Sequence, residues 1–203
     1  PTEGMRKTLL ERGFEDVVIW SRGVLTDVFR PDDPIEYEFD GPIWVYVGRV
    51  AVEKNIEAFL DLNLPGAKVI IGDGPDRKRL VNANPNCHFL GYKFGRELAR
   101  HIAGADVFVF PSKTDTFGIV MLEAMACGVP VAAFPVTGPI DVVRAGETGC
   151  LHEDLITACS CALELNRWDC RQYAESRSWG RSTRQFVSHL APRDTFLAEA
   201  KAA

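Results

Sequence analysis

Residues 107–134, VFVFPSKTDTFGIVMLEAMACGVPVAAF, place a long apolar segment between two short ones. The outer segments, 107–110 and 131–134, have the length and the β-branched and aromatic residues typical of buried strands. The middle segment, 117–127, is long enough for a helix and is followed by Gly128 and Pro130, residues that commonly end one. This order predicts a strand–helix–strand unit with two parallel strands.

The same alternation extends to both sides of this unit. Because continuous apolar strands that alternate with helices are typical of a parallel sheet covered on both faces, we predict a doubly wound, Rossmann-like α/β fold. We also predict a short strand at 14–20, an irregular acidic stretch at 22–42, and two or three helices from Asp154 onward. The further strands are expected at 43–47, 68–71 and 88–90, and the helices at 53–62, 76–83, 95–104, 117–127 and 139–145.

Composition and charge restrict the class of protein. The chain has 203 residues, of which 46% are hydrophobic and 25% charged, so a disordered chain is excluded. No apolar run approaches the roughly 20 residues of a membrane-spanning helix, and the first ten residues do not resemble a signal peptide. A net charge of −5 argues against binding to nucleic acid, whereas one small anion needs only local cations.

None of the six cysteines forms a C-x-x-C pair. We interpret all six as reduced thiols of a cytoplasmic protein, most of them buried. A zinc site from Cys150, His152, Cys159 and Cys161 is conceivable, but its spacing matches no common structural type.

The loops that follow the strands should carry the chemistry, because ligands of such sheets bind at the carboxyl ends of the strands. Gly48 and Arg49 follow one strand directly, and Lys54 lies near the start of the next helix. Two cations beside a helix N-terminus favour an anion, most plausibly a diphosphate. The alternative is two surface cations at a helix start.

Two other glycine-containing loops give weaker signals. The loop Gly72-Asp-Gly-Pro75 lacks the third glycine of a dinucleotide-binding motif, because Arg77 occupies that position. We therefore favour a tight turn before a helix. The sequence Gly91-Tyr92-Lys93 is typical of an ordinary strand-to-helix turn.

The loop after the strand at 107–110 is the most informative. Asp115 and Thr116 are typical helix N-cap residues, which predicts outward-facing N–H groups from 116 to 119. Glu123 lies within the apolar helix that follows, where an ionised carboxylate needs a partner. That partner could be a neighbouring backbone group or arginine, or a hydroxyl-rich ligand such as a ribose.

Together these residues resemble the retaining GT-B glycosyltransferases of the group that carries an E-x7-E motif. The resemblance rests on Gly48-Arg49 with Lys54, on the Gly72–Pro75 turn, and on Asp115 and Glu123 with seven residues between them. Arg22-Gly23-Val24 and Phe29-Arg30-Pro31 are similar to the interdomain segment of that group. Asp115 departs from the pattern because the first acid is usually Glu.

The resemblance implies a fold of two Rossmann-like domains, of which this chain is the C-terminal, donor-binding half. Residues 1–42 would be the connector and the end of a missing N-terminal domain, and residues 43–203 the nucleotide-sugar-binding domain. Arg49, Lys54 and Asp115 would be catalytic, with the two cations on the donor diphosphate, and Glu123 would bind the ribose hydroxyls. The implied donor site as a whole comprises Gly48, Arg49, Lys54, Leu90, Tyr92, Asp115, Phe117, Gly118, Ile119 and Glu123, with Leu90 and Tyr92 at the base and no metal or other cofactor.

The implied reaction is transfer of a sugar from a nucleoside diphosphate sugar, with retention at the anomeric carbon, to a lipid or polysaccharide acceptor. The isolated chain would bind donor but transfer nothing, and would tend to self-associate. Arg177, Arg181 and Arg184 form a candidate basic face toward an anionic acceptor or a membrane surface, although a solvated or domain-packing face is the favoured interpretation.

Two alternatives stay open. One is a nucleotide-sugar epimerase or a phosphorylase relative on the same fold, although no lysine lies in a plausible pyridoxal-phosphate setting. The other is a non-enzymatic sugar-nucleotide-binding module that acts in a complex.

Overall fold

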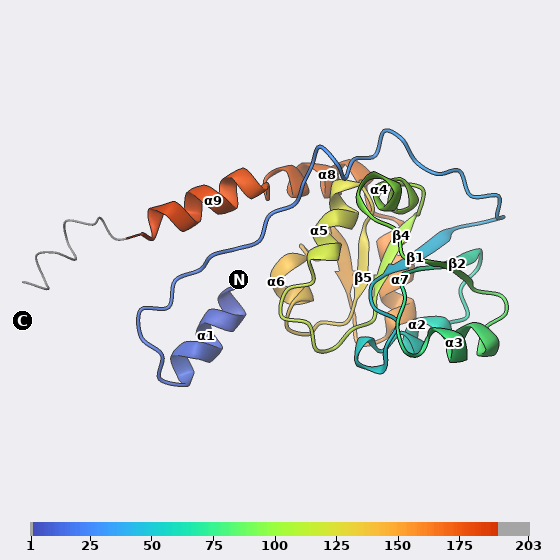
Figure 1. The fold of residues 1–203 in the computed structure, drawn as a ribbon, viewed down its shortest axis with the longest axis horizontal. Helices are drawn as coiled ribbons and strands as arrows, with labels where there is room; N and C mark the ends of the chain where they lie inside the picture. The colour runs from blue at the N-terminus through green and yellow to red at the C-terminus, as the bar shows by residue number, and fades with distance from the viewer. Residues whose placement is uncertain (1, 191–203) are drawn as a thin grey trace, which may run out of the picture.

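A computed structural model describes residues 2–190 and shows a six-stranded parallel sheet with helices on both faces (Figure 1). The strand order is β3-β2-β1-β4-β5-β6, and every adjacent pair is parallel. The doubly wound α/β prediction is therefore confirmed. The strands are β1 (Ile43–Val47), β2 (Ala67–Ile71), β3 (His88–Gly91), β4 (Val107–Phe110), β5 (Val131–Ala133) and β6 (Gly149–Leu151).

The strand order reverses between β1 and β4. Trp44 pairs with Val107 and Val45 with Phe108 across this junction. The chain leaves β1 toward β2 on one side and leaves β4 toward β5 on the other, so the loops after these two strands diverge. Such a switch point leaves a crevice at the carboxyl edge of the sheet, which is where α/β proteins bind ligands.

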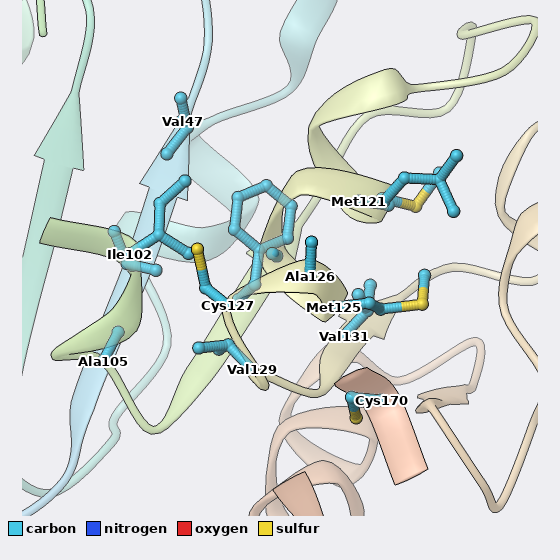
Figure 2. Packing of buried hydrophobic residues seen from close by; sticks show 14 of the residues in the cluster. Val47, Ile102, Ala105, Met121, Met125, Ala126, Cys127, Val129, Val131 and Cys170 are labelled. Atoms are coloured by element: carbon cyan, nitrogen blue, oxygen red, sulfur yellow. The ribbon is translucent and has the colours of Figure 1, made fainter. Parts of the chain in front are cut away.

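Two hydrophobic cores lie on the two faces of the sheet, because side chains along each strand point alternately up and down. On one face, Val45 and Phe108 pack with the helices α4 (Gly95–Ala103), α5 (Ile119–Ala126) and α8 (Arg167–Glu175). Figure 2 shows Ile102 of α4 against Cys127 and Val129 in this core. The other face packs Trp44 and Ile70 against α2 (Glu57–Leu60), α3 (Arg77–Ala83) and α7 (Leu155–Leu163).

The remaining elements surround this sheet. The short helices are η1 (Val52–Lys54) after β1 and α6 (Pro139–Val142) after β5. At the two ends of the chain lie α1 (Glu3–Glu11) and α9 (Trp179–Ser188), which Figure 1 draws to one side of the sheet. The predicted helices from Asp154 onward are thus α7, α8 and α9. None of the helices within residues 2–190 combines the length and the apolar character that crossing a membrane requires.

Several element boundaries differ from the sequence predictions. The strand predicted at 14–20 is wrong: this segment is irregular, and Phe14, Val18 and Trp20 remain exposed. Hydrogen bonds from side chains elsewhere in the sequence hold its backbone instead. One of them runs from the Arg6 Nε to the Val17 carbonyl. The helix α1 and the strand β6 were not predicted. The helix expected at 53–62 is split into η1 and α2 because Asn55 has φ +51°.

The cysteine interpretation also needs correction. Cys150 of β6 and Cys161 of α7 are joined by a disulfide, because α7 packs back onto the strand that carries Cys150. The pairing also removes two of the thiols of the conceivable zinc set. Cys127, Cys159 and Cys170 are free and buried, as expected.

The predicted division into residues 1–42 and 43–203 stays a prediction. In the described part, Val24 and Phe29 of the connector contribute to the core beside α8. Residue 1 and residues 191–203 lie outside the described residues.

Candidate functional site

A cavity of about 470 Å³ opens at the switch point, between the loops that follow β1 and β4. Its walls come from the ends of both strands, from the start of α5, and from two segments that reach the sheet from outside it. The lining residues are Arg22, Tyr46, Val47, Gly48, Arg49, Lys54, Phe110, Ser112, Asp115, Phe117, Gly118, Ile119, Val120 and Trp179.

The loop after β1 is fixed through its backbone. The Gly48 N–H donates to the Ile71 carbonyl at 3.0 Å, and the Val50 N–H donates to the Asp73 carbonyl at 2.9 Å. The buried Tyr46 hydroxyl donates to the Arg49 carbonyl at 2.8 Å. The Arg49 backbone is therefore held, while its side chain is 64% exposed and lies 3.4 Å from the Glu53 carboxylate. A mostly exposed guanidinium with one weak partner can turn toward a ligand.

Lys54 joins the two loops across the cavity. Its ammonium lies 2.9 Å and 2.8 Å from the two carboxylate oxygens of Asp115. At the next residue, the Asn55 Nδ2 donates to the Pro111 carbonyl at 2.9 Å. Side chains from the β1 loop thus hold the loop after β4 in place at two points.

The charge of the cavity favours an anion. Arg22, Arg49 and Lys54 line it, and Asp115 is the one carboxylate among the lining residues within 2–190. After the Lys54–Asp115 pair is taken as neutral, two guanidinium groups are left. The first turn of an α-helix adds positive potential from its N–H groups.

The helix α5 begins at Ile119, two residues later than expected. Gly118 has φ +74° and forms its N-cap, so Asp115 and Thr116 do not cap the helix. Asp115 is engaged by Lys54 instead. Phe117, Gly118 and Ile119 line the cavity at the beginning of α5, where the N–H groups of its first turn lie.

The structure brings seven of the ten predicted site residues to this one cavity. Leu90, Tyr92 and Glu123 are not among its lining residues. Leu90 packs partly buried against the core, and Tyr92 is exposed and stacks on Phe94 with ring centroids 5.8 Å apart. Neither residue reaches the cavity because both lie at the end of β3, which is two strands away from β1 in the sheet.

Glu123 lies half-buried on α5, three residues after Val120, which lines the cavity. Burial raises the pKa of Glu123 to about 7. Within residues 2–190, no side chain forms a salt bridge with this carboxylate. Glu123 is thus partly buried in an apolar helix, and its predicted role toward a ribose stays a prediction.

Seven residues of the cavity wall were not among the predicted site residues: Arg22, Tyr46, Val47, Phe110, Ser112, Val120 and Trp179. Five of them carry a local signal, because they lie at the end of a predicted strand, within two residues after it, or in the predicted helix 117–127: Tyr46, Val47, Phe110, Ser112 and Val120. Arg22 and Trp179 reach the cavity only because Val24 forms a parallel bridge with Ser178. These two segments approach so closely that a Cβ on Gly23 would lie 2.5 Å from the Trp179 backbone.

Comparison with known proteins identifies the family. Residues 41–164, most of the chain, match the family described as Glycosyl transferases group 1. The chain belongs to this family of glycosyltransferases. The family assignment agrees with the doubly wound sheet and with the position of the cavity at its switch point.

The chain is similar to enzymes with different printed activities. It is 39% identical over 159 residues to the GDP-mannose-dependent alpha-mannosyltransferase of Mycobacterium tuberculosis, a match that covers 74% of this chain and 42% of the relative. It is 34% identical over 182 residues to the sulfoquinovosyl transferase SQD2 of Arabidopsis thaliana, covering 77% and 36%. The chain thus spans less than half the length of these two relatives.

Solved structures share the fold. The sucrose-phosphate synthase of Thermosynechococcus elongatus superposes with a TM-score of 0.78 at 25% identity, over 97% of this chain and 58% of that one. The lipopolysaccharide outer core galactosyltransferase WaaB superposes with a TM-score of 0.75 at 21% identity, over 92% and 59%. The Rossmann-like unit is therefore the domain of GT-B glycosyltransferases that this chain provides.

Proposed function

We propose that this chain is the donor-binding half of a retaining glycosyltransferase that uses a nucleoside diphosphate sugar. One observation carries the proposal: Arg49 and Lys54 come together with the start of α5 in the cavity at the switch point of the sheet. Two cations and a helix N-terminus complement the two phosphates of such a donor.

The chemistry places the largest demand on the leaving group. When the bond between the anomeric carbon and the diphosphate breaks, negative charge develops on the phosphate oxygens. Arg49 and Lys54 would stabilise that charge in a cavity partly shielded from water, where electrostatic interactions are strong. No metal or other cofactor is part of this proposal, because the two side chains supply the positive charge.

Donor binding would rearrange the Lys54–Asp115 pair. A diphosphate that accepts from the Lys54 ammonium competes directly with the Asp115 carboxylate. Asp115 would then be free to accept a hydrogen bond from a hydroxyl of the donor sugar. Glu123 would accept from the ribose, and Leu90 and Tyr92 would lie near the base, so that the donor extends from the cavity along the sheet edge.

The donor and acceptor are proposed from relatives. The mycobacterial relative is named for GDP-mannose, which makes a guanosine diphosphate hexose the first donor to test. Lipids or polysaccharides are the proposed acceptors. A cytoplasmic location with peripheral contact at the membrane would suit such acceptors, while a solvated or domain-packing face stays the favoured interpretation of Arg177, Arg181 and Arg184.

A second domain would complete the active site. The chain spans less than half of the reported curated relatives. Large apolar side chains are exposed on the two segments that run beside each other at one end of the molecule, and self-association of the isolated chain would cover them. They are Phe14, Val18, Trp20, Phe186, Val187 and Leu190.

Calorimetry and a turnover assay test the proposal together. We expect GDP or UDP to bind the chain with a dissociation constant of about 10 μM to 1 mM, which corresponds to a binding free energy of roughly −4 to −7 kcal/mol. Arg49→Ala should weaken binding by roughly 1.5–3 kcal/mol, as expected for a lost charged hydrogen bond. Arg79→Ala, which removes an exposed cation of α3 that pairs with Glu57 of α2 and does not line the cavity, is the matched control and should bind like the wild type.

A sugar-transfer assay distinguishes a complete enzyme from its donor-binding half. The isolated chain should transfer no hexose from GDP-mannose or UDP-glucose to an acceptor, because acceptor positioning and water exclusion need the second domain. Robust transfer by this chain alone would contradict the proposal of a half-site. Absence of any nucleoside diphosphate binding would contradict the donor role itself.

A further inference from the structure

Ser112 is a buried hydroxyl in the wall of the cavity. It lies two residues after the end of β4, is 1% exposed, and lines the cavity together with Arg49 and Lys54. Its Oγ is buried and has no hydrogen-bond partner among residues 2–190. A buried hydroxyl without a partner has lost its hydrogen bonds to water and gained nothing in exchange, which costs folding free energy.

The other buried serine and threonine side chains of the described chain all have partners. Thr2 Oγ1 accepts from the Met5 N–H, and Thr148 Oγ1 accepts from the Arg144 N–H. Ser182 Oγ accepts from Trp20 Nε1 and donates to the Ser21 carbonyl. Ser112 is therefore exceptional in this fold, and alanine would fill the same place without the cost.

The backbone around Ser112 is fixed by side chains of the loop after β1. The Asn55 amide donates to the Pro111 carbonyl, and the Lys54 ammonium holds Asp115 three residues later. The serine itself retains one free side-chain torsion. Its hydroxyl can consequently turn toward an occupant of the cavity without movement of the loop.

We propose that the Ser112 hydroxyl is a binding group of the donor site and donates a hydrogen bond to a phosphate oxygen of the nucleoside diphosphate. This inference rests on the proposed function of the cavity. A phosphate oxygen is the preferred acceptor because Arg49 and Lys54, which line the same cavity, attract the diphosphate to this edge of the sheet. An occupant that accepts this hydrogen bond removes the cost of the buried hydroxyl.

Ser112→Ala tests the inference through two measurements with opposite expected signs. Titration calorimetry with GDP and with inorganic diphosphate should give dissociation constants about tenfold higher than those of the wild type, the change expected when a hydrogen bond to a charged group is lost. The urea unfolding midpoint without ligand should stay the same or rise, because the unpartnered hydroxyl is gone. Ser182→Ala is the matched control: its midpoint should fall, and its affinity for GDP should not change.

The outcomes that overturn the inference differ from those that overturn the proposed function. If the wild type binds GDP and Ser112→Ala binds it equally well, the inference is wrong and the donor site stands. A fall in the unfolding midpoint like that of Ser182→Ala would assign the hydroxyl a structural partner instead. Weaker GDP binding with unchanged diphosphate binding would overturn the phosphate contact. If neither GDP nor UDP binds the wild type, the proposed function fails and the inference with it.

Discussion

Two neighbouring loops at the carboxyl edge of the sheet both contain glycines, but only one faces the cavity. The loop after β1 carries Gly48, Arg49 and Lys54 into the cavity wall. The loop after β2, Gly72-Asp-Gly-Pro75, contributes no lining residue and packs behind the first. A Cβ on Gly72 would lie 1.9 Å from the Gly48 carbonyl, and one on Gly74 would lie 2.2 Å from the Val50 carbonyl.

The glycines of the second loop are thus required by backbone packing rather than by a ligand. The loop supports the first one through its own backbone, since the Asp73 carbonyl accepts from the Val50 N–H. A glycine-rich strand-to-helix turn is a weak indication of a phosphate site for this reason. In this chain the cations beside the glycine distinguish the binding loop from the supporting loop.

Gly72→Ala should have the largest effect of the substitutions that separate these two loops. The new Cβ would force the two loops apart and would also occupy a backbone with φ +137°. We expect the free energy of unfolding to fall by on the order of 4 kcal/mol in urea titrations, with loss of nucleoside diphosphate binding. Gly91→Ala is the control: it has φ +72° but nothing within 4 Å of the new Cβ, so it should cost only about 1 kcal/mol. Equal losses in both variants would contradict the supporting role of the Gly72 loop.

Lys54→Met should have a smaller effect than Gly72→Ala. It should weaken GDP binding more than it lowers folding stability. We expect GDP affinity to fall by about 1.5–3 kcal/mol in calorimetry, because a charged contact to the phosphates is lost. The variant also leaves Asp115 without its cation. The double variant Lys54→Met/Asp115→Asn should therefore recover folding stability without recovering affinity. If the double variant binds GDP like the wild type, Lys54 acts only by neutralising Asp115.

Glu123→Gln should give the smallest effect, visible as a change in pH dependence. Because burial raises the pKa of Glu123 to about 7, the folded state holds a proton that the unfolded state releases nearer pH 4.5. The stability of the wild type should therefore fall relative to that of the variant as the pH rises from about 5 to 8. For a half-buried side chain we expect a difference of about 1 kcal/mol in urea titrations.

The control and the ligand data decide what Glu123 does. Glu153→Gln, on the exposed turn after β6, should leave the pH profile unchanged. Glu123→Gln should lower the affinity for GDP and leave that for inorganic diphosphate nearly unchanged. If both ligands weaken equally, Glu123 is structural and the ribose role is wrong.

The core of the fold was predictable because each strand of a doubly covered parallel sheet is apolar on both faces. Val107–Phe110 and Ile43–Val47 stand out as continuous apolar segments, and the loops that follow them could be located at once. Residues 14–20 look similar, but their partners are single distant groups, such as the Ser182 hydroxyl that accepts from Trp20 Nε1. A local pattern cannot contain that information.

The candidate site was predictable to the same extent. Residues that lie directly after β1 and β4 meet at the switch point by topology alone, so Arg49, Lys54 and Asp115 could be expected together. The ion pair between Lys54 and Asp115 could not be predicted, because both side chains were expected to face a ligand. The contribution of Arg22 and Trp179 depends on a bridge between segments more than 150 residues apart, which composition and spacing do not reveal.

A crystal structure of the chain with GDP or UDP bound tests the central claim most directly, because it shows which loop holds the diphosphate. We predict both phosphates in the cavity between the ends of β1 and β4, with Arg49 and Lys54 in contact and the Lys54–Asp115 pair opened. A diphosphate bound at the Gly72–Pro75 loop, or at Arg181 and Arg184 of α9, would contradict this account of the donor site.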